Sequence, residues 1–329
     1  MGRLTSAVRK ALSSSHDLSN RAFDIGRTLI ALAQLSLLIS TPADNMFVPV
    51  GEAPALARCE PLGVISAFCW GEPELARWLL VVALALVVIG FAPRLTAWLH
   101  LYVSLSIALA IDLPEGGDQA AVAATACIAI ISVSDNRIWV WRRSETTYRL
   151  GGLLYGVSWA AHWLLRFQMA YIYLNSSISK MSVEAWQDGS AVYYVSRMEY
   201  FGVSGPFADV LRDLTAVPLL AVAATWGTMM IELSIAVLIL CSRPWQRIGF
   251  LFSAGLHIMI ITMIGLGSFG LVMIGGVLAA TSLGWARRTT APQILGGGGS
   301  TRREQARDTI NTDAGSSITG EKAPRLGQS

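Results

Sequence analysis

The sequence predicts an all-α protein: a polytopic membrane helix bundle of about eight transmembrane helices with an outer interfacial helical segment. Of its 329 residues, 53% are hydrophobic and only 14% are charged, whereas soluble domains carry about 25% charged residues. The apolar residues gather into runs long enough to cross a hydrocarbon core of roughly 30 Å. Arginines occur in every second connection between these runs, as the positive-inside rule requires.

Eight apolar runs follow one another along the chain. About 20 residues span the bilayer as a helix, because each residue adds 1.5 Å. The first run follows a basic arm and could be a secretory signal, but it is long and lacks a convincing cleavage site, so we expect a retained span. The predicted spans are 22–39, 75–91, 95–111, 120–133, 150–174, 217–240, 248–264 and 269–285.

The connections predict the orientation. With the N-terminus inside, every inner connection contains arginine, while the outer connections are acidic, mixed or uncharged. We therefore expect a multi-pass protein of the cell (plasma) membrane, with both termini cytoplasmic and the connection 175–216 outside. That connection is long and rich in aromatic residues, which predicts an ordered set of short interfacial helices. The net charge of +3 is spread over short loops and a tail, so it predicts orientation and not nucleic-acid binding.

Three segments are expected along the chain. Residues 1–21 form a cytoplasmic arm, residues 22–285 a transmembrane domain, and residues 286–329 a disordered cytoplasmic tail. The tail is rich in Gly, Ser, Thr and Arg and has few apolar residues, so it cannot bury a core. Residues 296–300 read Gly-Gly-Gly-Gly-Ser, which is either a native low-complexity stretch or an introduced linker.

A polar stripe on the fifth span is the main candidate site. Arg166, Tyr173 and Lys180 are seven residues apart, so they fall on nearly one helix face, and His162 extends this face inward. A charge at bilayer depth costs roughly 2.5–3.5 kcal/mol and normally faces the bundle interior. Lys180 is either a helix-end lysine that reaches the interface or a partly desolvated amine that releases its proton readily and acts as a base.

Two further ionisable residues lie inside later spans, Glu232 in the sixth and His257 in the seventh. Counted from the span ends, Glu232 lies at nearly the level of His162, and His257 at nearly the level of Arg166. Two interpretations remain open for Glu232: a structural pairing with His162 or Arg166, and a role in lining a polar site.

The four cysteines predict one structural bridge. Cys59 and Cys69 fall in an outer loop, where the environment permits a disulfide; a redox-active pair is the weaker alternative. The sequence shows no pattern of metal ligands. Residues 265–270 match Gly-x-Gly-x-x-Gly but join two apolar helices, so they do not predict a nucleotide site.

The stretch from Arg166 to residue 194 resembles the HTTM (horizontally transferred transmembrane) family, which includes vitamin K-dependent γ-carboxylase and the SdpB group of sporulation-delaying proteins. The resemblance covers roughly residues 20–286, including Phe23-Asp-Ile-Gly-Arg27 in the first span. Its central motif consists of Arg166, Gln168, Tyr173, Lys180-Met, Trp186 and Asp188-Gly-Ser-Ala-Val-Tyr-Tyr.

The resemblance implies a chemistry for the stripe. In the carboxylase, the lysine at the Lys180 position deprotonates a reduced quinone, so a quinone (menaquinone or vitamin K hydroquinone) is the expected cofactor and no metal is expected. Lys180, Arg166 and Tyr173 are then the catalytic candidates, and Gln168, His162, Trp186, Asp188, Glu232 and His257 line the substrate cavity. Ser179 stands where the carboxylase has a second lysine, and the chain ends after its eighth span, so it looks closer to the SdpB group.

Three functions remain open. The resemblance implies an integral membrane protein that matures a secreted antimicrobial or toxin peptide at an outward-facing site, with an SdpA-like partner and a precursor peptide as substrate. It could be a vitamin K-dependent carboxylase-like membrane enzyme. The alternative is a membrane transporter or exporter of a peptide or small molecule, although the sequence shows no internal repeat. A third possibility is a structural or immunity-type membrane protein.

Overall fold

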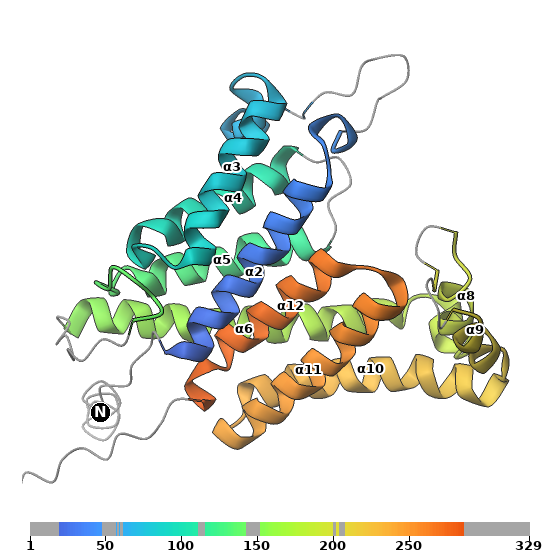
Figure 1. Cartoon of the computed structure of the whole chain (residues 1–329). Coiled ribbons are helices and arrows are strands. Elements are labelled where there is room, and N and C mark those ends of the chain that lie inside the picture. Colours follow the sequence, from blue (N-terminus) through green and yellow to red (C-terminus); the bar gives the residue numbers. More distant parts are fainter. Residues whose placement is uncertain are drawn as a thin grey trace, which may run out of the picture. The chain divides into compact units, whose positions relative to one another are not determined.

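The computed structural model describes residues 20–47, 57, 59, 62–110, 116–142, 152–199, 202–203 and 208–285. In this part of the chain the regular structure is helical, apart from one bridge between Phe91 and Trp139. The predicted arm, except for its last two residues, and the predicted tail lie outside the described residues. The long helices are α2 (Arg21–Ser40), α3 (Pro73–Ile89), α4 (Pro93–Ala110), α5 (Gly116–Ser132), α6 (Gly152–Lys180), α10 (Pro218–Leu240), α11 (Arg243–Ile264) and α12 (Gly267–Ala280) (Figure 1).

These helices coincide with the eight predicted apolar runs. Among the described residues, α2, α10 and α11 are long and apolar enough to cross a membrane, and α5 and α12 are shorter apolar helices. The protein is thus an all-α membrane helix bundle, and the expectation of eight crossings stays a prediction. Three short helices, α7 (Glu184–Gln187), α8 (Ala191–Val195) and α9 (Ala208–Ala216), fall in the long connection where short helices were predicted.

Proline and glycine set several helix ends. Pro73 and Pro218 stand in the first turns of α3 and α10, where the missing N–H is not needed and the fixed φ suits the helix. Gly90 and Gly265 follow α3 and α11 with φ of 82° and 81°. Such left-handed residues end a helix, and glycine adopts them without steric cost.

The largest departure from prediction is the length of α6. It was expected to end near residue 174 and instead continues to Lys180. A cation in the last turn is favourable because it faces the negative end of the helix dipole. The extension matters because Lys180 is consequently held by a helix and not by a loop.

Two apolar cores meet at α2. One core is built from α5, α6, α10, α11 and α12 together with Phe23, Ile30 and Ala33 of α2. The other joins α3 and α4 to Ala31 and Leu38 on another face of α2. Because α2 contributes to both cores, it couples the N-terminal helices to those that carry the polar stripe.

Glycine lets α2 and α12 pack with their backbones in close approach, and Figure 1 shows the two helices side by side. A Cβ on Gly26 would lie 2.6 Å from the carbonyl oxygen of Gly275, and a Cβ on Gly275 would lie 2.6 Å from that of Gly26. Any side chain at either position would therefore push the helices apart.

Candidate functional site

Lys180 is held by α10. Its Nζ lies 2.8 Å and 2.9 Å from the two carboxylate oxygens of Glu232 and 2.6 Å from Oγ of Ser176, one turn earlier on α6. The Ser176 hydroxyl also donates to Glu232, at 3.2 Å. The side chains of Lys180 and Glu232 are only 21% and 9% exposed. Lys180 is therefore a partner in an ion pair, which differs from a lysine that reaches out to the interface.

Tyr173 is held by α11. Its hydroxyl lies 2.8 Å from Oγ of Ser253 and 2.8 Å from Nε2 of His257. All three residues are buried, and the His257 ring packs edge-on against Phe269 of α12. The stripe residues Tyr173 and Lys180 thus belong to two polar clusters, one shared with α11 and the other with α10.

The ion pair lies within the length of α10. Glu232 is eight residues from Leu240 and 14 from Pro218, roughly 12 Å and 21 Å along the helix. Because α10 has the length and composition of a membrane span, a crossing along α10 would place the pair inside the apolar layer. There the carboxylate offsets the cost of burying the ammonium.

Part of the long connection packs beside the Pro218 end of α10, where Figure 1 places α8 and α9. The N–H of Val192 donates to Thr225 of α10 at 3.1 Å. A Cβ on Gly189, which has φ of 84°, would lie 2.8 Å from the Val222 side chain. Just before this, the ring of Trp186 lies 5.2 Å from Nζ of Lys180, so one aromatic side chain of the connection contacts the ion pair.

Arg166 and His162 lie apart from these clusters. Arg166 donates to the carbonyl oxygens of Ile239 and Cys241 at 2.7 Å and 3.2 Å, so it caps the last turn of α10. His162 bonds through Nε2 to Oγ of Ser282, at 3.0 Å. The predicted structural pairing of Glu232 with His162 or Arg166 is wrong, because Glu232 faces Lys180.

Asp188 and Gln168 were also predicted to line the cavity. Asp188 is exposed and accepts from the backbone N–H and hydroxyl of Ser190, at 2.8 Å and 2.6 Å. These bonds hold the pKa of Asp188 below its usual value and give the carboxylate a turn-forming role. Gln168 is half-buried in α6, and its side chain makes no hydrogen bond to another described residue.

Sequence reasoning missed the two serines of the clusters. Ser176 precedes Lys180 by four residues, and Ser253 precedes His257 by four. This is the spacing at which side chains meet on a helix face, and it is the signal that could have found them.

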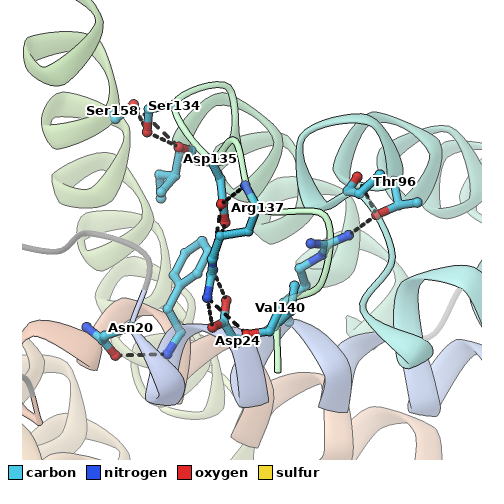
Figure 2. A network of polar contacts seen from close by, with 12 residues as sticks. Asn20, Asp24, Thr96, Ser134, Asp135, Arg137, Val140 and Ser158 are labelled. Atoms are coloured by element: carbon cyan, nitrogen blue, oxygen red, sulfur yellow. Dashed lines mark hydrogen bonds and ion pairs between the residues drawn. The ribbon is translucent and has the colours of Figure 1, made fainter. Parts of the chain in front are cut away.

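A third network joins α2 to the connection between α5 and α6 (Figure 2). Arg137 binds Asp24 through both terminal nitrogens, at 2.9 Å and 3.0 Å, and binds Asp135 at 2.7 Å. Burial alone would lower the pKa of Arg137, but hydrogen bonds to Asp135 and Asp24 outweigh it and raise the pKa above its usual value. Arg137 also donates to the carbonyl of Val140, so this network fixes the connection against α2.

The cysteine pair predicted to form a bridge, Cys59 and Cys69, is joined by a disulfide, with Cα atoms 5.7 Å apart. Cys127 and Cys241 are free thiols. Within the described part of the chain, no group of three or more His, Cys, Asp or Glu side chains is arranged to hold a metal ion.

The geometry limits the available chemistry. An ammonium has three N–H donors, and Glu232 with Ser176 provides acceptors for all of them. Transfer of one proton over the 2.8 Å to Glu232 would leave a neutral amine beside a neutral acid, an arrangement that suits a low-dielectric site. The Tyr173 hydroxyl and the His257 ring form a second donor–acceptor pair through which a proton can move.

These features define a membrane helix bundle with an ion pair and a tyrosine–histidine cluster inside it. Residues 155–285 match the HTTM domain, and this range contains every member of both clusters. The chain is 30% identical to the uncharacterized protein YitO of Bacillus subtilis (strain 168) over 260 residues, 77% of this chain and 82% of YitO. The chain therefore belongs to the HTTM family.

Another relative is the sporulation-delaying protein SdpB of Bacillus subtilis (strain 168). The identity is 28% over 261 residues, 77% of this chain and 78% of SdpB. No solved structure matches the chain.

Proposed function

We propose that the chain is an SdpB-like integral membrane protein that matures a secreted antimicrobial or toxin peptide, with Lys180 as the reactive group. Similarity to a sporulation-delaying protein over 78% of that protein's length supports a role in a toxin-peptide pathway. The single observation that carries the site is the buried contact of Lys180 with Glu232. Both residues lie within the range 155–285 that matches the HTTM domain.

In the proposed mechanism, Lys180 acts as a base. Its ammonium first passes a proton to the Glu232 carboxylate, and the neutral amine then accepts a proton from an acidic group of the substrate. Glu232 thus stabilises the positive charge of Lys180 at rest and accepts the proton when that charge is lost. Tyr173 and His257 position the acidic group and exchange protons with it.

A quinone, menaquinone or vitamin K hydroquinone, is the proposed cofactor. In this proposal, the polar contact of the group is the Lys180 amine and its flat apolar contact is the Trp186 ring, which lies 5.2 Å from Nζ of Lys180. When bound, a reduced quinone would supply an acidic hydroxyl. This would make the protein a carboxylase-like membrane enzyme.

The proposed setting is the plasma membrane, with both termini in the cytoplasm and the site reached from outside. The proposed partners are the secreted precursor peptide and an SdpA-like protein. A setting beside lipid is supported by the connection that follows Lys180. It has exposed apolar side chains, among them Met181, Val183 and Met198.

Mass spectrometry of the secreted peptide tests the proposal. Lys180→Ala alone leaves Glu232 buried without its partner, so the decisive variant combines Lys180→Met with Glu232→Gln, which removes both charges. We expect a folded protein and no mature peptide. Ser179→Ala, at the exposed neighbouring position, is the matched control and keeps wild-type output. Mature peptide at wild-type level from the folded double variant would overturn the catalytic role.

Transport is the second candidate, and the depth of the ion pair favours it. Paired charges within the membrane are typical of substrate and proton pathways in transporters. Proteoliposomes that contain only this chain and show peptide or solute flux, lost in the double variant, would replace the maturation proposal.

A further inference from the structure

Two connections that are distant in the sequence are joined into one surface. They are residues 90–92, between α3 and α4, and residues 133–142, after α5, and we call them the bridged connections. Phe91 and Trp139 form an antiparallel bridge, and backbone hydrogen bonds of 2.7 Å and 2.9 Å flank it. The two rings are in contact, with their centroids 5.3 Å apart. An aromatic pair is thus held by backbone pairing at this end of the bundle.

The bridged connections are fixed against the bundle from within. Arg137 binds α2 and the carbonyl oxygen of Val140 (Figure 2), and the Val140 side chain is buried. The residues on either side of Val140 are exposed, as expected where successive side chains of an extended segment face opposite sides. The exposed fraction is 42% for Trp139 and 48% for Trp141, and it reaches 66% for Ile138. These apolar side chains therefore stand on a base that hydrogen bonds hold in place.

The exposed rings continue an apolar face of α3. Along this helix, exposed apolar side chains recur at alternating intervals of four and three residues, which places them on one face. They are Leu75, Leu79, Val82, Leu86 and Ile89. In a membrane helix bundle such a face contacts lipid, and Phe91, which is also exposed, follows it directly. The aromatic pair thus lies where a lipid-facing surface ends, and aromatic rings are enriched at that level, between the hydrocarbon and the headgroups.

The exposed charges at this surface are positive. Arg94 and Arg142 each follow one residue of the bridged pair by three positions, and both are exposed. Asp135, the acidic residue of the bridged connections, is buried and paired with Arg137. Arg94 stands in the first turn of α4, where a cation faces the positive end of the helix dipole, and it donates to the neutral amide oxygen of Asn136 at 3.3 Å. This position does not favour α4 itself, and an anion beside the surface would offset its cost.

We propose that the bridged connections, together with Arg94, bind the anionic phospholipid headgroups of one leaflet and so fix the depth of the bundle in the bilayer. The rings occupy the headgroup level, and the two arginines attract the lipid phosphates. Phosphatidylcholine has the same phosphate but also a cation that neutralises it, so the surface prefers lipids of net negative charge, such as phosphatidylglycerol. A second copy of this chain is a poorer occupant, because a symmetric contact would bring like charges together.

Quenching of tryptophan fluorescence by brominated lipids tests this surface in bilayers that contain the full chain. The chain has 11 tryptophans, so the signal of the two exposed rings is taken as the difference between the wild type and Trp139→Phe/Trp141→Phe. An arginine near an anionic membrane surface favours association about fivefold. We therefore expect brominated phosphatidylglycerol to half-quench the difference signal at a mole fraction at least fivefold lower than brominated phosphatidylcholine with the same acyl chains. The preference should shrink as salt is raised, because salt screens exposed charges.

Charge removal tests the arginines. Arg94→Gln/Arg142→Gln should lower the preference to less than twofold and, because both side chains are exposed, leave the Tm in detergent unchanged. Arg243→Gln/Arg247→Gln, which removes two arginines from the first turns of α11, is the matched control and keeps the wild-type preference. Equal quenching of the wild type by the two lipids would overturn the proposal, and so would an equal loss of preference in the control. Quenching by neither lipid would overturn it as well, because protein would then cover the rings. None of these outcomes bears on the Lys180 site.

Discussion

Arg137 provides the sharpest test of how the bundle is held together. It neutralises two carboxylates at once, and the side chains of Asp24 and Asp135 are only 3% and 5% exposed. Arg137→Met would leave both as neighbouring unpaired charges of like sign. Removal of one partner from a buried ion pair costs about 3–5 kcal/mol of folding stability. Because two carboxylates lose their partner here, we expect a loss in the upper half of that range.

Thermal unfolding of the purified protein in detergent would measure the effect. A loss of this size lowers the Tm by on the order of 10 °C in a chain of this length. Arg142→Met is the matched control, because Arg142 lies in the same connection but is exposed, and we expect it to change stability by less than about 0.5 kcal/mol.

A rescue experiment separates charge from packing. Adding Asp24→Asn and Asp135→Asn to the Arg137→Met protein removes both unpaired charges, so at least half of the lost Tm should return. If Arg137→Met melts like the wild type, or if the asparagines restore nothing, the buried network does not stabilise the fold as reasoned here.

Three further predictions test individual contacts. Gly275→Ala should destabilise the protein by about 1–3 kcal/mol through overpacking. Gly255→Ala, with open space around its Cβ, should instead stabilise α11 by about 0.5–1 kcal/mol. Thermal melts in which the two changes in Tm do not have opposite signs would contradict the close approach of α2 and α12. Cys59→Ser should lower stability by about 2–3 kcal/mol, and a reductant should then have no further effect on its Tm; continued sensitivity would refute the bridge to Cys69. Arg166→Gln should cost about 1.5–3 kcal/mol through lost charge-assisted bonds, with mature-peptide output per folded molecule unchanged; lost output at normal protein level would return Arg166 to the catalytic candidates.

The helices could be predicted from sequence because membrane segments are defined by length and composition. Each of the eight apolar runs is a helix in the structure. Prolines stand in first turns and glycines follow last turns, as the φ preferences of these residues predict. The end of α6 was misplaced because residues 175–180 are polar apart from Ile178, and hydropathy cannot distinguish a polar helical turn from a loop.

The members of the site were predictable, but their partners were not. Glu232 and His257 stood out because ionisable side chains are rare in apolar runs, and Tyr173 and Lys180 because they follow Arg166 at intervals of seven residues. Depth along a helix, which the sequence provides, does not fix the rotation of that helix about its axis. Each residue turns the helix by about 100°, so Glu232 could have faced any neighbour, and depth alone placed it nearest the level of His162.

Networks between distant segments were out of reach for a related reason. Asp24 and Arg137 are 113 residues apart, and no local pattern joins them. The same holds for Gln34 and His100, which are 66 residues apart. In both cases the sequence shows polar residues near or inside an apolar run, and only the packing of α2 against its neighbours shows what they bind.

The stripe on α6 makes three separate contacts with two neighbouring helices, and this determines how its variants must be interpreted. Arg166 binds the last turn of α10, Tyr173 binds α11, and Lys180 binds the middle of α10. A substitution at any of the three loosens a contact between helices as well as removing a reactive group, so loss of function points to a role only when it is measured per folded molecule. Only Lys180 has a charged partner, Glu232, that can be neutralised in the same variant. That variant lacks the proposed base but leaves no unpaired charge in the bundle. The paired substitution of Lys180 and Glu232 is therefore the change in this stripe that separates chemistry from folding.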